Sequence, residues 1–391
     1  MQCAVAQSSD PDPQLAIAEI ASQVSSKLGP ARPDLVIGFA SVAYEQERTA
    51  ALLKEKFQGS IVTGCSDAGG ITAEGPVAQG IAVLAVRSER MKFTLGLGEN
   101  IGKNIRQAGI GLGNDILQKG GHPSLLISLA DGLAGNGADL IRGIQARLGK
   151  DFPIVGGSAG DDFLFKKTFE YFEGKALTGA VIGIGISGDF KFGIGVRHGW
   201  VPIGVQMKAT RSKGAVISKI DNKPAVSVYE DYFGEQKALK LREEPLARLA
   251  ITYPLGIKTN KSDEYLIRDP ISVDEDGAIT CAAEIPEGSD IRLMIGSKED
   301  AIEAARQAAR QAVSQMAGKE VKLAMIFNCI ARYKLLGRDA KKEIDAIREV
   351  VGERVPLFGF YTYGEHAPLP SELHGGPTVF HNETAVILTI G

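Results

Sequence analysis

The sequence lacks the long apolar run that a membrane-spanning helix requires. Its longest stretch without a charged side chain runs from Ala176 to Gly188, whereas a spanning helix needs about 20 consecutive apolar residues. The N-terminal segment has neither the positive charge nor the apolar run of a secretory signal. We therefore expect a protein that is neither secreted nor attached to a membrane.

Cysteine is also scarce, with four residues in 391 (Cys3, Cys65, Cys281 and Cys329). No two of them have C-x-x-C spacing, and none clusters with histidine at the spacing of zinc ligands. This pattern excludes a disulfide scaffold and favours a reducing, cytoplasmic setting. It also predicts no bound metal.

No excess of positive charge is present, since 44 lysines and arginines stand against 47 acidic residues. A net charge of -3 excludes the basic surface typical of nucleic-acid-binding proteins. Glycine, by contrast, is abundant at 47 residues. Many tight turns and close backbone approaches are expected from so much glycine.

A pattern of three apolar runs occurs three times along the chain. The first runs are 35–41, 125–131 and 323–329; the second are 61–70, 153–162 and 356–365; the third are 80–86, 179–186 and 383–390. The link between the first and second runs is long enough for a crossover helix, which predicts parallel strands. The second run ends in a glycine-rich turn, so we expect the second and third strands to form an antiparallel hairpin.

These repeats predict an α/β fold of two interlocked modules. Mixed β-sheets covered by helices should be built from repeated β-α-β-turn-β units. The glycine turns at Gly64, Gly156 and Gly359 are expected at strand ends, where α/β proteins place ligands. A further helix is predicted after Ser297, because S-x-x-D precedes a run of strong helix formers.

Cofactor motifs are incomplete. No lysine follows the glycine turns as a Walker loop requires. The segment from Gly96 to Gly102 has the outline of a dinucleotide loop, but its G-x-G-x-x-x-G spacing favours a strand end. Residues 156–160 match G-x-S-x-G, yet a hairpin-like segment follows where a nucleophile elbow needs a helix. We therefore expect no cofactor.

Several strings resemble the FIST domain family. DLVIGFAS, GCSDAGG and GIAVLAV resemble the FIST N-terminal domain, whereas NCIAR, GFYTYGEHAP and HNET resemble the FIST C-terminal domain. Together they span roughly Arg32 to Thr384, and the resemblance implies a FIST N-terminal sensory domain over residues 1–220 and a FIST C-terminal domain over residues 221–391. The resemblance implies an intracellular sensory and signal-transduction module that binds a small ligand, with amino acids the favoured class, and that acts on a signalling partner protein.

Polar residues in these strings are the candidate ligand-binding residues: Ser66, Ser158, Asn328, Cys329, Arg332, Tyr361, Tyr363, Glu365 and Asn382. Cys329 is expected at the floor of a pocket. The Arg332 fork suits a ligand carboxylate and Glu365 an ammonium group; alternatively, the two form a structural ion pair. Tyr361, Tyr363 and Glu365 could share one face of a strand.

We assign no catalytic residue, but two other functions stay open. One is a hydrolase or transferase that uses Ser158 or Cys329 as nucleophile. The other is a protein-interaction scaffold. A serine or cysteine bonded to a histidine would favour the enzyme, whereas a polar pocket without such a pair would favour the sensor.

Overall fold

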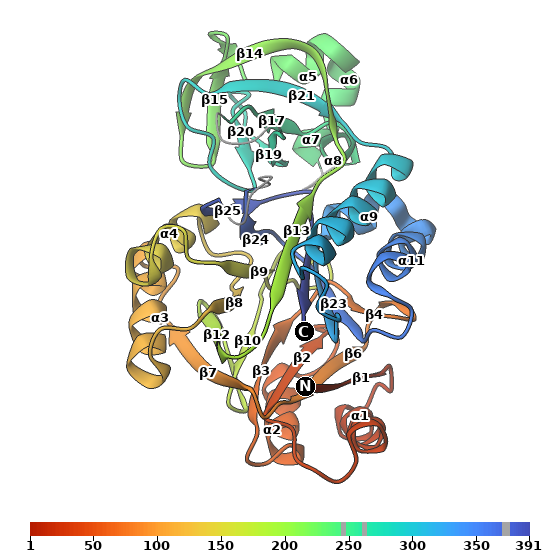
Figure 1. Cartoon of the computed structure of the whole chain (residues 1–391). Coiled ribbons are helices and arrows are strands. Elements are labelled where there is room, and N and C mark those ends of the chain that lie inside the picture. The colour runs from red at the N-terminus through yellow and green to blue at the C-terminus, as the bar shows by residue number, and fades with distance from the viewer. Residues whose placement is uncertain (244–247, 260–263, 370–375) are drawn as a thin grey trace.

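The computed structural model describes residues 1–243, 248–259, 264–369 and 376–391. The fold is mixed α/β, as predicted from the repeats. Three similar units lie around a common core, and a fourth sheet forms a separate lobe at the top of Figure 1. In the described part of the chain, no helix is both long and apolar enough to cross a membrane.

Units I and II are continuous in sequence. Unit I contains β1 (Gln2–Ser8), α1 (Pro13–Leu28), β2 (Leu35–Ala40), α2 (Gln46–Lys56), β3 (Ile61–Ser66), β4 (Gly70–Thr72), β5 (Gly75–Val77) and β6 (Ile81–Arg87). Unit II contains β7 (Met91–Gly98), α3 (Ile105–Gly120), β8 (Leu125–Ala130), α4 (Gly137–Leu148), β9 (Ile154–Ser158), β10 (Glu170–Phe172), β11 (Lys175–Leu177) and β12 (Val181–Gly188).

Unit III is interrupted by an insertion after its first strand. It contains β13 (Phe192–Arg197), α9 (Lys298–Ser314), β22 (Leu323–Cys329), α10 (Ile330–Leu336), η1 (Gly337–Asp339), α11 (Ala340–Val351), β23 (Leu357–Thr362), β24 (Glu365–Pro368), β25 (Thr378–His381) and β26 (Ala385–Ile390). The predicted S-x-x-D start of α9 is confirmed, because the Ser297 side chain accepts a hydrogen bond from the Asp300 amide.

The insertion spans residues 201–295, and its described residues form their own antiparallel sheet and four short helices. It contains β14 (Val201–Lys213), β15 (Val216–Ile220), β16 (Lys223–Pro224), α5 (Ser227–Phe233), α6 (Glu235–Ala238), α7 (Lys240–Glu243), α8 (Arg248–Thr252), β17 (Leu255–Ile257), β18 (Leu266–Arg268), β19 (Pro270–Val273), β20 (Ile279–Cys281) and β21 (Asp290–Ile295).

Strand pairing inside each unit follows one scheme. The first two repeat strands are parallel, as predicted: β2 with β3, β8 with β9, and β22 with β23. The expected hairpin of second and third strands is wrong. Strands β6, β12 and β26 pair antiparallel with the first repeat strand, on its other side. A separate small hairpin occupies the sequence between the second and third strands.

Each small hairpin joins the sheet of another unit. The β4–β5 hairpin of unit I pairs with β23 of unit III, β10–β11 of unit II pairs with β3 of unit I, and β24–β25 of unit III pairs with β9 of unit II. The three sheets consequently have the same order, for example β1-β6-β2-β3-β10-β11 in unit I. This cyclic exchange interlocks the units.

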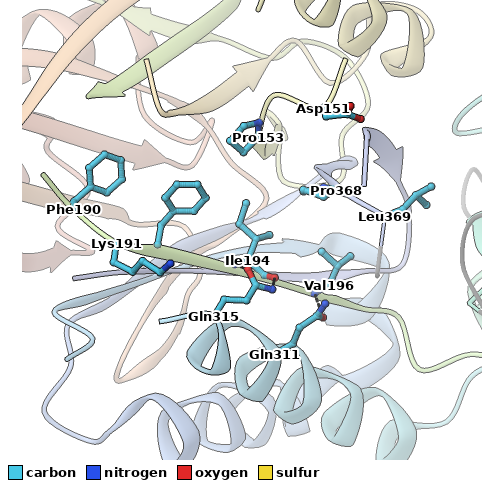
Figure 2. A pocket seen from close by; sticks show the side chains of 11 residues that line it. Asp151, Pro153, Phe190, Lys191, Ile194, Val196, Gln311, Gln315, Pro368 and Leu369 are labelled. Atoms are coloured by element: carbon cyan, nitrogen blue, oxygen red, sulfur yellow. Dashed lines mark hydrogen bonds between the residues drawn. The ribbon is translucent and has the colours of Figure 1, made fainter. Parts of the chain in front are cut away.

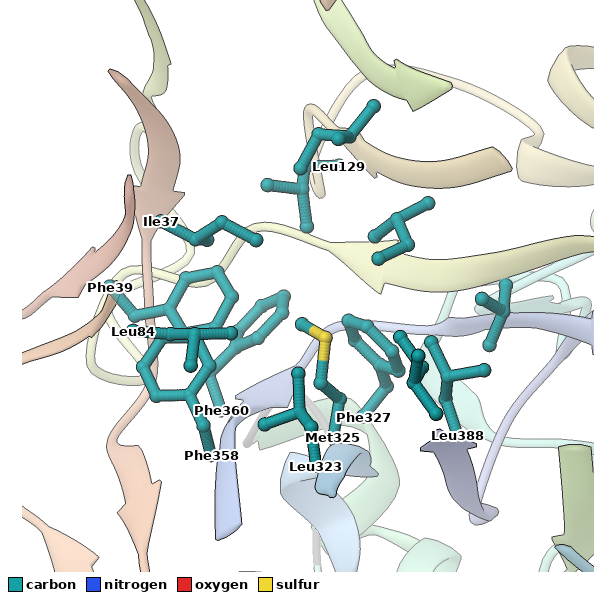
Figure 3. Packing of buried hydrophobic residues seen from close by; sticks show 14 of the residues in the cluster. Ile37, Phe39, Leu84, Leu129, Leu323, Met325, Phe327, Phe358, Phe360 and Leu388 are labelled. Carbon is teal, nitrogen blue, oxygen red and sulfur yellow. The ribbon is translucent and has the colours of Figure 1, made fainter. Parts of the chain in front are cut away.

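The central core lies where the three sheets face one another (Figure 3). Phe39 of β2 stacks on Phe358 of β23 with ring centroids 4.8 Å apart, and it contacts Phe360 at 4.2 Å. Leu129 of β8 and Leu388 of β26 belong to the same cluster. Burial of this apolar surface from all three units is the main force that holds them together.

The glycines predicted to form turns at strand ends lie inside strands instead. A Cβ atom at Gly64 would lie 1.8 Å from the Gly38 carbonyl oxygen, and one at Gly156 would lie 2.0 Å from that of Ser128. A Cβ atom at Gly359 would likewise lie 1.9 Å from the carbonyl oxygen of Ile326. Close approach of the parallel partner strand, rather than a turn, therefore requires glycine at these three equivalent positions.

The outer edge strand of each unit is covered by side chains from a helix. Gln23 of α1 bonds both the amide and the carbonyl of Gln7 in β1, and Asp115 of α3 accepts from the Leu97 amide in β7. In unit III, Gln315 bonds both backbone groups of Ile194 and Gln311 accepts from Val196 (Figure 2). These contacts satisfy edge groups that would otherwise pair with another strand.

Candidate functional site

A cavity of about 660 Å³ lies where units II and III meet the insertion. We call it the junction cavity. Unit II contributes the loop after β8 with the start of α4, and Ser158 and Phe165; the insertion contributes β19, β20 and neighbouring residues; unit III contributes Cys329, Ile330, Tyr363, Phe380 and Asn382. A volume of this size accommodates a small metabolite.

A second cavity of about 400 Å³ lies beside β13 and α9 (Figure 2). Its wall includes Phe190, Phe192 and the two glutamines that cover the β13 edge. Its two glutamines already bond the backbone of β13, and its charged lining residues are Asp151 and Lys191. The junction cavity is larger and is lined by three different parts of the fold, so it is the candidate site.

At the end of the junction cavity that we call its floor, buried polar atoms lack a donor in the described part of the chain. Asp269 Oδ1 and Asn382 Oδ1 belong to residues that line the cavity, and both carboxylate oxygens of Glu383 lie next to Asp269, outside the lining; none of them receives a hydrogen bond from a donor group there. The carboxyls of Asp269 and Glu383 contact each other. Cys329 lies beside them. Unpaired buried polar atoms are costly and mark a place where a ligand can bind.

Three different elements place these groups together. Cys329 is the last residue of β22, and Asp269 links β18 to β19 in the insertion. Asn382 and Glu383 form the turn between β25 and β26, where Glu383 has a φ of 58°. A non-glycine residue in this region of backbone space is strained, and such strain is typical of functional sites.

The floor is acidic, and burial governs its titration. Loss of solvent raises the pKa of Glu383 and of Glu365 well above the usual range, with the neighbouring Asp269 carboxyl adding to both shifts. Burial, together with the carboxyls of Glu365 and Glu383, also raises the pKa of the Cys329 thiol. The group as a whole favours protons or another cation.

The start of α4 forms another part of the lining. Gly135, Asn136 and Gly137 line the cavity, and the Asn136 side chain caps the helix by accepting from the Ala138 amide. A helix N-terminus carries partial positive charge, which favours an anion. The lining of the junction cavity thus includes both an acidic group and a helix N-terminus.

Four of the predicted site residues line the junction cavity: Ser158, Cys329, Tyr363 and Asn382. Cys329 is among the lining residues, whereas Arg332 lies outside the lining. The Tyr363 hydroxyl donates to Asp161 and its ring stacks on Phe165 at 4.9 Å.

The other predicted residues lie in the surrounding core. Ser66 donates to the Gly160 carbonyl and accepts from the Phe169 amide. Asn328 donates to Glu343. The Tyr361 ring lies 4.6 Å from that of Tyr333.

Arg332 pairs with Glu343 of α11 rather than with Glu365. Its guanidinium uses all five N–H donors, on Glu343 and on the carbonyls of His198, Ala301 and Glu383. No donor is left for a ligand carboxylate. Glu365 instead accepts from the Thr362 hydroxyl and the Thr384 amide. The structure therefore shows neither of the two arrangements that the sequence left open: Arg332 has no donor free for a ligand carboxylate, and it does not pair with Glu365.

Tyr361, Tyr363 and Glu365 do not share one strand. Strand β23 ends at Thr362 and β24 begins at Glu365, so Tyr363 lies in the turn. Because the chain reverses there and β24 joins the sheet of unit II, the alternation of a single strand does not apply.

Within the residues that the structure describes, no nucleophile paired with a base lines the junction cavity. Among the described residues, no hydrogen bond joins Ser158 or Cys329 to a histidine. A serine–histidine pair does exist, with Ser128 Oγ 2.5 Å from His366 Nδ1. Both side chains are fully buried and outside the cavity lining, and burial lowers the pKa of His366 to about 3.

Sequence reasoning missed Asp269, Glu383 and Glu343. Glu343 left a recognisable signal, since it falls between Ala340 and Ile347 on the apolar face of an amphipathic helix. Glu383 lies in the HNET string, but only the fold shows that its side chain is buried.

Comparison with known proteins gives one curated relative and several structural neighbours. An uncharacterized protein of Methanocaldococcus jannaschii is 29% identical over 153 residues, which is 36% of this chain and 29% of that protein. The chain thus spans about 29% of the length of that relative. A chorismatase structure covers 99% of this chain and 97% of its own at 9% identity, with a TM-score of 0.38. A cyanuric acid hydrolase from A. caulinodans covers 100% and 99% at 10% identity, also with a TM-score of 0.38.

Two family models match adjacent parts of the chain. The FIST N domain matches residues 34–223 and the FIST C domain matches residues 225–368. Between them they cover nearly the whole chain, and FIST domains are recognised as sensory and signal-transduction modules. The chain therefore belongs to the FIST family.

Proposed function

We propose that this protein is a cytoplasmic sensor whose ligand, an amino acid or similar small metabolite, binds in the junction cavity. The observation that carries the proposal is the pair of buried oxygens, Asp269 Oδ1 and Asn382 Oδ1, that belong to the cavity lining and have no donor in the described part of the chain; the Glu383 carboxyl beside Asp269 has none there either. A ligand that supplies donors there would recover the free energy lost by burying these groups. Four free cysteines are consistent with a reducing compartment.

The two sides of the cavity suit the two ends of an amino acid. The acidic floor around Asp269 attracts an amine, which offers N–H donors and positive charge. The start of α4 at Asn136 and Gly137 favours a carboxylate. Apolar side chains between them, including Ile271, Ile330 and Phe380, would contact the ligand side chain.

The position of the cavity supports a role in signalling. The insertion is tied to unit II by Glu284, which bonds Asn136 and Arg142 of α4. It is tied to unit III by Arg268, which donates to the Phe380 carbonyl. A ligand in contact with all three walls would favour one arrangement of the insertion, and a signalling partner protein could recognise that arrangement.

The enzyme alternative is less well supported. Ser158 and Cys329 line the cavity without a histidine partner among the described residues, and burial raises the pKa of the Cys329 thiol, which disfavours a nucleophilic thiolate. A scaffold role does not explain why polar groups without donors line an internal cavity.

A thermal-shift screen against amino acids and other small metabolites tests the proposal. A ligand at 100 times its Kd stabilises the folded state by about 2.7 kcal/mol, which corresponds to a rise in Tm of roughly 5–10 °C. The shift should shrink in Asp269→Asn and Asn382→Ala and persist in Asp189→Asn, a carboxylate exposed far from the cavity. If no metabolite shifts the melt, or the cavity variants respond like wild type, the sensor proposal is wrong.

A further inference from the structure

We propose that Asp269, Cys329 and Glu383 form a binding site for a divalent transition metal at the floor of the junction cavity, with Zn²⁺ the best match. The site does not depend on the identity of the metabolite. It rests on the proposed function at one point only, which is that the bound ion would contact the ligand.

Geometry is the first argument. One ligand atom from each of the three residues lies within 4.8 Å of the other two, and all three side chains are buried. A Zn²⁺ ion bound at about 2.0–2.3 Å holds tetrahedral ligand atoms roughly 3.5 Å apart. Side-chain movements of an ångström or less would therefore bring the sulfur and two carboxylate oxygens onto one ion.

The unmet hydrogen bonds are the second, independent argument. Asn382, of which 1% is exposed, lines the same cavity with Oδ1 unpartnered among the described residues. Together with Asp269 Oδ1 and both Glu383 oxygens, it belongs to a set of acceptors that have no donor in the described part of the chain. A cation is the partner that such a set lacks.

The nearby arginines do not fill this role. Arg332 uses all its donors elsewhere, including the Glu383 carbonyl. Arg268 donates to the carbonyls of Ile267, Glu284 and Phe380. The carboxylates of Asp269 and Glu383 thus face each other without a side-chain cation bonded to either in the described part of the chain.

Ligand chemistry selects the ion. A thiolate with carboxylate oxygens suits Zn²⁺, whereas Mg²⁺ and Ca²⁺ prefer sites made of oxygen alone. Three protein ligands leave the fourth position of a tetrahedral ion open, and Asp269 and Cys329 line the cavity, so that position would open toward the ligand. The amine of an amino acid would occupy it, while the carboxylate reaches the start of α4.

Metal titration of the untagged full-length protein tests the site. After removal of bound metal with a chelator, Zn²⁺ is titrated by calorimetry and Co²⁺ by absorption spectroscopy, in both cases without any metabolite. We expect one equivalent of either ion to bind, and a thiolate-to-cobalt charge-transfer band. Cys329→Ser should abolish that band. Glu383→Gln and Asp269→Asn should each weaken Zn²⁺ binding at least as much as the loss of an outer-shell partner does, about 10–100-fold.

Cys281→Ser is the matched control, because Cys281 is a buried cysteine that lines the same cavity outside the cluster; its metal binding should equal that of wild type. Circular dichroism without metal verifies that each variant folds, and the charge-transfer band reports the thiolate in the unmutated protein. Absence of the band, or Zn²⁺ affinity unchanged in Glu383→Gln and Asp269→Asn, overturns the metal site. A metabolite shift that persists after chelation would overturn the direct contact between ion and ligand but not the sensor proposal.

Discussion

Arg332 and Glu343 form an ion pair in which both side chains are fully buried, with Nη2 2.5 Å from Oε1. The pair connects α10 to α11, and its remaining bonds reach backbone carbonyls in three other segments. Glu343 also accepts from Asn328 at the end of β22. A buried charge network of this kind holds the framework beneath the cavity rather than the ligand.

Arg332→Ala should therefore destabilise the ligand-free protein by about 3–5 kcal/mol, because it leaves the Glu343 carboxylate buried without its cation. Urea unfolding of the ligand-free protein measures this loss. Arg90→Ala is the control, since the Arg90–Asp189 pair is largely exposed and such pairs contribute about 0–1 kcal/mol. An Arg332→Ala protein that unfolds at the wild-type urea concentration but binds metabolite poorly would return Arg332 to the binding site.

Gly156→Ala should destabilise the protein by about 4 kcal/mol or more, which places it among the most damaging substitutions. The new Cβ would lie 2.0 Å from a backbone oxygen of the paired strand, and neither strand can move without disturbing the sheet. Gly111→Ala in α3 is the opposite case, because nothing lies within 4 Å of the added Cβ. It should stabilise the helix by about 0.5–1 kcal/mol. Similar unfolding curves for the two variants would contradict this account.

Thiol labelling should be slow at Cys329 and Cys281 in the native protein. Both side chains are almost fully buried, and burial raises the pKa of the Cys281 thiol to about 12. Mass spectrometry after alkylation at pH 8 should find both unmodified while the urea-unfolded chain reacts at all four cysteines. Faster labelling at Cys329 than at Cys3 would instead support the enzyme alternative.

Stability should fall on acidification, in part because of His366. Burial lowers its pKa to about 3, whereas an unfolded histidine titrates near 6.5. Between about pH 6.5 and 3 the unfolded chain takes up the proton and the folded chain does not, so the free energy of unfolding decreases as pH falls through this window. The full contribution of His366 to the free energy of unfolding is present above about pH 6.5.

Comparison of wild type with His366→Gln isolates this effect, since buried carboxyls with raised pKa values, such as Glu170, act in the opposite direction. Urea unfolding at several pH values should give the variant a shallower dependence, by up to about 1.4 kcal/mol per pH unit. Equal slopes for the two proteins would show that His366 is protonated in the folded state.

Local patterns in the sequence predicted the repeat strands and α9, because burial dictates which residues are apolar and a capping side chain marks where a helix begins. The runs from Leu35, Leu125 and Leu323 are all strands. Pairing of β6 with β2, and the exchange of β10–β11 onto β3, could not be predicted, because the partner of a strand is chosen by tertiary contacts. The sequence predicts a turn at Gly156, because glycine is common both in turns and at close contacts between strands and the sequence does not distinguish the two.

The candidate site was predictable only where it coincides with strand ends. Cys329 ends an apolar run, and this position is the reason why the sequence predicts it near a pocket. Asp269 and Glu383 come from the insertion and from a turn in unit III, and no local spacing relates either of them to Cys329. The sequence predicts that Arg332 faces a ligand. Its true partner, Glu343, could not be identified, because the sequence does not show how the helix that carries Glu343 packs.

The exchange of hairpins also has a consequence for the order in which the chain can fold as it is synthesised. The β4–β5 hairpin of unit I pairs with β23, which leaves the ribosome only after most of the chain has been made. Until then β4 and β5 have no sheet to join, and the edge of β3 stays unpaired until β10–β11 have been synthesised. The first unit must therefore persist for most of translation as an incomplete, aggregation-prone intermediate. Once all three hairpins have been exchanged, no unit can separate without breaking its strand pairing with both of the other units.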